Sequence, residues 1–299
     1  IVLKKDTDMF LYRLFVFSKW AKYIGFLSYI LSLFSDHILF SHLTLFVLFV
    51  VVEIALNASV FFGSIAIICG MLVIKLRYGN SLPSVETHTS KVTYSLPFEG
   101  AWAVVNGGFT QAYSHSWNIP VQRYAYDFVQ LHEGRSYTGN ERDVERYHCY
   151  GKAILSPADG VVMKVNNRSN DSLILGKGRY FNQSNHIAGN YVLVKHAEDQ
   201  YSLMAHLKKD SILVQVGEKV VRGQQLAQCG NTGNSTEPHL HFHLQNGPHF
   251  YTSVGLPIRF SDLALQPCPQ YSLMDERPVM PLSSMPEGFI SRGYIVQNG

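Results

Sequence analysis

The chain has 299 residues, of which 46% are hydrophobic, and it carries 25 Lys and Arg against 22 Asp and Glu. Residues 1–79 hold seven basic and four acidic side chains, which leaves 18 of each sign in residues 80–299. A formally neutral C-terminal part excludes nucleic-acid binding driven by bulk charge, so we expect no nucleic-acid partner.

The first 77 residues have the composition of a membrane region. The run from His37 to Ile74 contains one carboxylate, Glu53, and no Lys or Arg. Because about 20 apolar residues span a bilayer, this run predicts two crossings, at residues 38–55 and 58–75. A weaker third crossing is expected at residues 20–34. We therefore predict two to three transmembrane helices with a lipid bilayer as partner, and a buried helical core is the alternative.

The flanking charges bear on orientation. Five basic residues before the main crossings favour a cytoplasmic N-terminus, and three crossings would then place the C-terminal domain outside the cell. Lys75 and Arg77, just after the last crossing, favour the opposite orientation. We expect a multi-pass protein of the cell membrane with an extracellular C-terminal domain. Because the chain begins with Ile1, we also expect further residues upstream.

The soluble part begins after a linker. Residues 78–93 are polar and interrupted by Gly and Pro, which is typical of a linker. Residues 94–299 form one predicted domain, in which short runs rich in Val, Tyr, Leu and Phe alternate with turn residues. This pattern indicates an all-β domain with a mostly antiparallel sheet. The tail from about residue 250 is expected to pack on or beside the sheet. The expected strands lie within residues 93–108, 123–131, 151–167, 190–196, 201–207, 211–220, 224–230 and 239–245.

The four cysteines form no motif. Cys69 lies in a predicted membrane segment, whereas Cys149, Cys229 and Cys268 are far apart and show no C-x-x-C spacing. A cysteine-type zinc finger is therefore excluded. At most one disulfide is possible.

The stretch "EPHLHFHLQ", residues 237–245, places His239, His241 and His243 at alternate positions. Alternate residues of a strand share one face, so three imidazoles would lie on a single surface. Imidazole is the commonest metal ligand, and this row therefore indicates a metal site. An exposed, histidine-rich strand is the alternative.

Two further residues are candidates for the same site. Asp127 interrupts the aromatic run "QRYAYDFV", and an aspartate is seldom buried without a partner. A role in capping a turn or in a salt bridge is its alternative. His206 occurs in "LMAHLKK", where strand alternation would place it on the same face as Met204. A hydrogen-bonded structural histidine is its alternative.

Six ordered blocks within residues 123–245 carry a family resemblance. They are "YAYDF", "SPADGVV", "GNYVLVKH", "YSLMAHL", "VQVGEKVVRGQQLAQCGNTGNST" and "PHLHFHL". Together they resemble the lysostaphin and LytM type of zinc endopeptidases, which cut peptide bonds in bacterial cell-wall peptidoglycan. The resemblance implies a β-rich catalytic domain with Zn²⁺ as its cofactor and peptidoglycan or another peptide as its substrate.

The resemblance also implies a role for each matching residue. Asp127 and His241 match zinc ligands. His239 matches the histidine proposed as general base, and His206 matches a second active-site histidine that steadies the water or the developing oxyanion. His243 falls where the family has an ordinary strand residue. We therefore expect it to support a ligand or to be a solvated histidine at the strand end.

One position departs from the family pattern. The first zinc histidine of the family lies four residues before the aspartate, and this chain has Arg123 there. Arginine stays protonated and cannot be a ligand. His115, in a loop with Trp117 and Pro120, is the preferred replacement. His132 and Gln122 are the weaker alternatives, because His132 would point to the opposite face and an amide oxygen is a poor zinc ligand.

These observations lead to a functional hypothesis. We expect a membrane-anchored zinc endopeptidase that acts on peptidoglycan. The rival is a non-catalytic module of the same fold that activates another wall hydrolase, and the missing histidine is its main support. A carrier or sugar-phosphotransfer domain is disfavoured, because the sequence lacks the lysine hairpin that a carrier requires.

Overall fold

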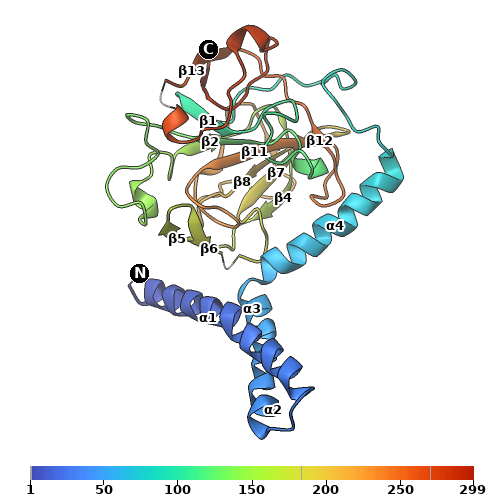
Figure 1. The fold of residues 1–299 in the computed structure, drawn as a ribbon. Coiled ribbons are helices and arrows are strands. Elements are labelled where there is room, and N and C mark those ends of the chain that lie inside the picture. The colour runs from blue at the N-terminus through green and yellow to red at the C-terminus, as the bar shows by residue number, and fades with distance from the viewer. Residues whose placement is uncertain (1, 183, 270) are drawn as a thin grey trace. The chain divides into compact units, whose positions relative to one another are not determined.

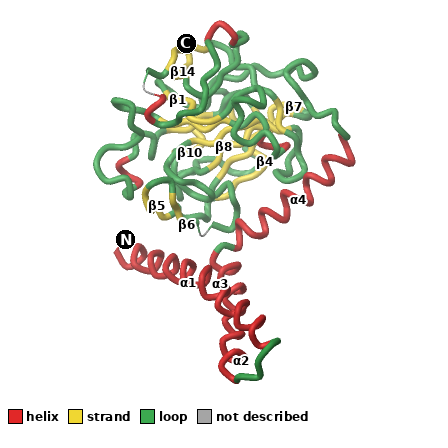
Figure 2. The backbone as a smooth tube through the Cα atoms, in the orientation of Figure 1, coloured by secondary structure: helices red, strands yellow, loops and turns green. Residues whose placement is uncertain are grey.

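The computed structural model describes residues 2–182, 184–269 and 271–299. The chain divides into two compact units, Ile1–Gly63 and Ser64–Gly299. The long helices occupy the N-terminal part, and the rest of the chain consists of strands and loops with short 3₁₀ turns between them (Figures 1 and 2). The helices are α1 (Val2–Ser32), α2 (Ile38–Thr44), α3 (Phe49–Leu56) and α4 (Ala58–Tyr78), with the 3₁₀ turn η1 (Leu45–Leu48) between α2 and α3.

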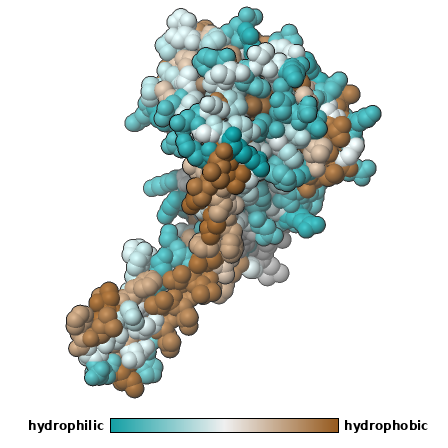
Figure 3. Space-filling model, turned by 90° about the vertical axis from the view of Figure 1, so that its right-hand side faces the viewer, coloured by the Kyte–Doolittle hydropathy of each residue, from teal (hydrophilic) through white to brown (hydrophobic). Residues whose placement is uncertain are grey.

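Two helical stretches near the N-terminus could cross a membrane by length and composition. They are Ile38–Leu56, which runs from α2 to the end of α3, and Ala58–Tyr78, which is α4. Both agree with the two main predicted crossings, and Asn57 separates them. Figure 3 shows hydrophobic residues gathered over the N-terminal helices and mostly hydrophilic residues over the visible face of the β domain.

The third predicted crossing, residues 20–34, lies mostly within α1, which is not among the helices of sufficient length and apolarity in the described chain. Lys19 and Lys22 interrupt its apolar surface. Lys22 forms an ion pair with Glu53 of α3, so the one carboxylate of the apolar run has a partner.

The β domain is built around a ten-stranded sheet. Its strand order is β13-β14-β1-β2-β11-β8-β7-β4-β9, and β12 pairs with β11 off this path. All pairs between named strands are antiparallel, which confirms the predicted sheet type. The strands are β1 (Trp102–Asn106), β2 (Tyr126–Val129), β3 (Ala153–Leu155), β4 (Gly160–Asn166), β5 (Leu173–Gly176), β6 (Arg179–Phe181), β7 (Tyr191–Ala197), β8 (Gln200–Ala205), β9 (Lys219–Val220), β10 (Gln225–Gln228), β11 (Leu240–Gln245), β12 (Gly255–Leu256), β13 (Leu263–Pro267) and β14 (Tyr294–Asn298).

The main core lies on one face of this sheet. Phe128, Met204 and Phe242, from β2, β8 and β11, are fully buried there. Alternation sends the intervening residues of the same strands to the opposite face. Leu203 and Ala205 of β8 lie in a second, smaller apolar cluster. The two faces of β11 therefore differ in chemistry, and the polar one carries the histidine row.

The C-terminal tail completes the sheet. The structure places β14 beside β1, β13 beside β14, and β12 beside β11, so the segment after residue 250 packs as expected. The hairpin of β5 and β6 was not predicted, because its apolar run is too short to show alternation. Cys69, Cys149 and Cys229 are free thiols.

Within the second unit, the C-terminal part of α4 contacts the loop between β11 and β12. The Asn246 amide donates a hydrogen bond to the Tyr78 hydroxyl, 2.6 Å away. A Cβ atom on Gly70 would lie 1.9 Å from the Tyr251 carbonyl oxygen, so glycine permits this close approach.

Candidate metal centre

Two neighbouring strands bring Asp127 and His241 together. The register of β2 and β11 sets these residues directly opposite each other, and directly opposed side chains on an antiparallel pair are close. The His241 Nδ1 atom lies 2.9 Å from Asp127 Oδ1. Ala205 is the partner of His241 on the other side, on β8. This small side chain leaves the imidazole unobstructed on that flank.

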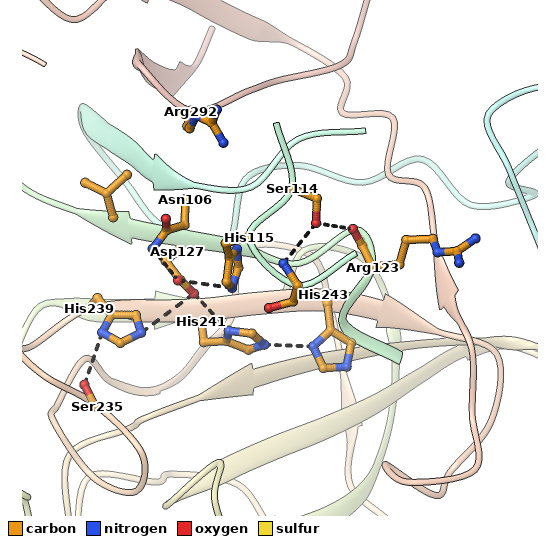
Figure 4. A network of polar contacts seen from close by, with 12 residues as sticks. Asn106, Ser114, His115, Arg123, Asp127, Ser235, His239, His241, His243 and Arg292 are labelled. Carbon is orange, nitrogen blue, oxygen red and sulfur yellow. Dashed lines mark hydrogen bonds and ion pairs between the residues drawn. The ribbon is translucent and has the colours of Figure 1, made fainter. Parts of the chain in front are cut away.

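His115 reaches the same place from a loop. Its Nε2 atom lies 3.5 Å from Asp127 Oδ2, and its side chain is 20% exposed. The ligand atoms of His115, Asp127 and His241 all lie within 4.8 Å of one another. Figure 4 shows the three side chains converging. The Nδ1 atom of His115 is buried and has no hydrogen-bond partner among the described residues.

Arg123 secures the loop that carries His115. Its guanidinium lies 4.6 Å from the centre of the Trp117 ring, and its Nε donates to the Trp117 carbonyl over 3.3 Å. The Arg123 carbonyl accepts from the Ser114 hydroxyl, 2.8 Å away, next to His115 (Figure 4). The residue at the family's histidine position is thus no ligand. It fixes the loop that presents another histidine.

The C-terminal tail also holds this loop. The guanidinium of Arg292, only 3% exposed, donates to the Tyr113 carbonyl over 2.8 Å and to the Ala112 carbonyl over 3.1 Å. Two arginines from opposite ends of the domain therefore fix the segment before His115. Nothing in the sequence near Arg292 indicated this role.

The Asp127 carboxylate is buried among histidine and asparagine side chains. Burial by itself would raise the pKa of Asp127, but His115, His239 and His241 hold that pKa well below its usual value. The Asn106 amide donates to Asp127 Oδ2 over 3.1 Å. Asn106, on β1, is a contributor that the sequence analysis missed. The carboxylate is consequently ionised at neutral pH.

His239 and His206 lie beside the three clustered residues with their Nδ1 atoms turned away. His239 Nδ1 lies 2.8 Å from the Glu237 carbonyl, and His206 Nδ1 lies 2.7 Å from the Thr232 carbonyl. A carbonyl only accepts, so each Nδ1 carries a proton and each neutral ring keeps its lone pair on Nε2. The two ring centroids are 4.7 Å apart.

His206 reaches the site because its backbone leaves the extended strand conformation. Its φ angle is 60°, so strand alternation stops at Ala205. The ring of His206 lies 5.7 Å from that of His241, on the face opposite to Met204. The predicted shared face of Met204 and His206 was therefore wrong, because alternation holds only while the backbone stays extended. Burial, together with the neighbouring histidines, lowers the pKa of His206 well below its ordinary value.

His243 is neither solvated nor at a free strand end. It is fully buried, and its Nδ1 lies 3.0 Å from His241 Nε2. Its own Nε2 lies 2.9 Å from Gln245 Oε1. Burial lowers the pKa of His243 to about 3. The solvated alternative was wrong, because the loop that ends in Phe250 covers this end of β11, with ring centroids of His243 and Phe250 5.9 Å apart.

Of the weaker ligand alternatives, His132 lies elsewhere. The ring of His132 is 5.8 Å from that of His148, outside the three-residue cluster. Gln122 ends a 3₁₀ turn before β2, and its backbone N–H donates to the Ile119 carbonyl.

The donor set fits zinc. Catalytic zinc sites take three protein ligands from His, Asp and Glu and keep a further position open. His115, Asp127 and His241 offer two imidazole nitrogens and one carboxylate oxygen. The short approach of His241 Nδ1 to an ionised carboxylate also favours a cation between them. These residues therefore form a possible metal site of the His/Asp/His type.

A pocket adjoins the far end of the histidine row. It is lined by Gln245 of β11, by Leu203 of β8 and by the loop residues Phe250 and Tyr251. His186 contacts both aromatic rings, at centroid distances of 5.6 and 5.8 Å. The pocket offers aromatic surface next to the buried polar chain.

Comparison with known proteins matches part of this domain to a peptidase family. Residues 144–251 match the family described as Peptidase family M23. A segment is 46% identical over 94 residues to the peptidoglycan DD-endopeptidase ShyA of Vibrio cholerae, covering 31% of this chain and 17% of that protein. Another is 26% identical over 166 residues to the murein hydrolase activator NlpD of Escherichia coli, covering 56% of this chain and 37% of that protein.

Among solved structures, the catalytic domain of lysostaphin from Staphylococcus simulans is 17% identical, with a TM-score of 0.31, covering 52% of this chain and 88% of that one. The chain spans well under half of the curated relatives named above. The family match covers five of the six predicted sequence blocks, all but "YAYDF". Residues 144–251 are therefore a domain of the M23 peptidase family, and the sequence blocks resemble its lysostaphin/LytM type.

Proposed function

We propose that the protein is a membrane-anchored zinc endopeptidase that hydrolyses peptide bonds of peptidoglycan. The observation that carries this proposal is the convergence of His115, Asp127 and His241 within 4.8 Å, with two further histidines beside them. In this proposal His115, Asp127 and His241 hold the zinc, and His239 and His206 act on the substrate and the attacking water.

The chemistry divides between the metal and the two histidines. Zinc, when bound, supplies a Lewis acid that lowers the pKa of water towards ~7 and polarises the scissile carbonyl. His239 offers a basic Nε2 atom 3.7 Å from Asp127 Oδ1, at the edge of the metal ligands. It can accept a proton there and return it to the leaving amine, while its Nδ1 hydrogen bond to Glu237 fixes the ring. His206, fixed by Thr232, keeps its Nε2 lone pair available to accept a hydrogen bond from the attacking water and so to orient it.

The substrate proposal rests on the relatives and on the surface near the site. ShyA is a peptidoglycan DD-endopeptidase, so a cell-wall peptide is the substrate class that we propose. The aromatic pocket beside Gln245 offers a place for a residue that flanks the scissile bond.

Membrane anchoring is proposed for residues 1–77, followed by a linker at residues 78–93 and the catalytic domain at residues 94–299. Two apolar helices support it, and only 22% of the residues in the most apolar window of α4 are buried. We propose a location in the cell membrane with the domain on the outer side, where peptidoglycan lies.

A second function has a specific observation behind it. NlpD is a murein hydrolase activator, and this chain has Arg123 at the position of the usual first zinc histidine. A regulatory module would bind no zinc and cut no peptide. Because the neighbouring loop supplies His115 as a third possible ligand, we favour the enzyme over the regulatory module.

The test is metal analysis and peptidoglycan digestion with the full chain in detergent. We expect one zinc per chain and release of peptide fragments, with both lost in Asp127→Ala and in His241→Ala. A matched control is Asp143→Ala, because Asp143 caps an exposed turn away from the site. Unchanged zinc content in both site variants would contradict the ligand assignment. A wild-type protein that binds no zinc would favour the activator.

A further inference from the structure

A chain of hydrogen bonds runs from the metal centre along the polar face of β11. His241 Nε2 lies 3.0 Å from His243 Nδ1, and His243 Nε2 lies 2.9 Å from Gln245 Oε1. The Gln245 amide nitrogen then donates to the Gly247 carbonyl over 2.6 Å. The side chains are nearly or fully excluded from solvent, with His241 6% exposed and the other two 0%.

The Gly247 carbonyl, at the far end of this hydrogen-bonded chain, determines which atoms donate and which accept. The Gly247 carbonyl only accepts, so it receives the Gln245 amide nitrogen and turns the amide oxygen towards His243. That oxygen also only accepts, so His243 Nε2 must carry a proton. The nitrogens of His243 contact an amide and an imidazole but no carboxylate, and a buried ring in such surroundings is neutral. His243 Nδ1 is therefore an acceptor, and His241 Nε2 donates to it.

This direction decides whether the His241 Nδ1 atom, which faces Asp127, carries a proton or a lone pair. With the proton on Nε2, the lone pair of His241 lies on Nδ1, 2.9 Å from Asp127 Oδ1. Two acceptors at this separation require a cation between them. The tautomer is thus the one that a metal ion at Nδ1 needs.

We propose that His243, backed by Gln245, is a positioning residue that presets the Nε2–H tautomer of His241 for metal binding. The inference rests on the zinc site of the proposed function and adds a requirement to it. His115 has no such support, since its buried Nδ1 lacks a partner in the described part of the chain. The two histidine ligands therefore differ: one is held by its own hydrogen bond and the other by its loop.

The experiment measures zinc affinity in the full chain in detergent, by competition with a chromophoric chelator. His243→Leu removes the acceptor, and we expect zinc to bind about 10–100-fold more weakly, as when other contacts behind metal ligands are lost. His243→Asn can keep an acceptor oxygen near His241 Nε2, and we expect it to recover most of that loss. The control is His196→Leu, which removes a histidine held between the Asp159 carbonyl and the Ser202 hydroxyl, with no change in zinc affinity.

A second readout does not depend on the variants or on zinc. Nitrogen NMR of the metal-free wild type, labelled with ¹⁵N-histidine, should show His243 neutral with its proton on Nε2. A proton on His243 Nδ1 overturns the proposal, as does a folded His243→Leu protein with wild-type zinc affinity. A wild type that takes up no zinc overturns the proposed function instead, and the NMR result then decides this inference alone.

Discussion

The two faces of β11 are equally buried but held in different ways. Leu240, Phe242 and Leu244 pack into the main core, where apolar burial needs no particular partner. On the other face, each polar side chain meets a specific atom of the next, from Asp127 through His241 to Gln245. A buried polar group without such a partner would cost about 1–3 kcal/mol. One strand therefore specifies the fold with one face and the chemistry with the other.

The sharpest test of the polar face is His239→Ala. His239 Nε2 lies 3.7 Å from Asp127 but outside the three-residue cluster. We expect peptide hydrolysis to fall by about 10²–10⁴-fold while zinc content stays the same, because the general base is lost and the proposed ligands are kept. Steady-state kinetics with metal analysis checks this. Loss of zinc together with activity would make His239 a ligand.

A substitution on the apolar face should have the opposite effect and reduce stability without affecting zinc binding. Phe242→Ala leaves a cavity in the main core, and we expect the free energy of unfolding to fall by about 3–5 kcal/mol. Zinc binding by the protein that remains folded should be unchanged. Denaturant unfolding in detergent measures the loss, and His249→Ala, at an exposed position, is the control. A stable variant that had lost its zinc would contradict the division between the faces.

The loop that carries His115 provides a smaller effect. Arg123→Ala removes the contacts with Trp117, and we expect zinc affinity to weaken about tenfold, or about 1.4 kcal/mol, as for other groups that orient a metal ligand. Arg123→Lys should recover little, because an ammonium cannot reproduce the planar stacking. Arg146→Ala, at a side chain that is 64% exposed, is the control. Chelator competition gives the affinities, and a wild-type value for Arg123→Ala would separate the loop from the metal site.

The smallest effect concerns a histidine away from the site. Burial lowers the pKa of His196, so the unfolded chain takes up this proton more readily than the folded one. Stability should therefore decrease as the pH falls below about 6.5, and the decrease should be smaller in His196→Gln. Unfolding curves between neutral pH and pH 5 measure the slope. An identical slope in the variant would show that other groups carry the pH dependence.

Local sequence patterns predicted much of the architecture. Alternation predicted β11 and its two faces, and the apolar run from residue 37 to residue 74 predicted two helices with a break near Asn57. The ordered blocks pointed to Asp127, His239 and His241 through the family resemblance. The predictions of strands and helices succeeded where the signal is periodic or contiguous, because neighbouring residues in the chain then determine the local conformation.

The tertiary structure decided what local patterns could not. His206 joins the site through one left-handed residue, and His243 is buried because the loop after β11 folds back over the strand end. Asn106 and Arg292 approach the site from elements far away in the chain. The sequence by itself determined which residue types are available on β11 and β2. Only the packing of separate segments decided which nitrogen meets which oxygen, because hydrogen bonds and metal ligation depend on distances between atoms that chain spacing does not set.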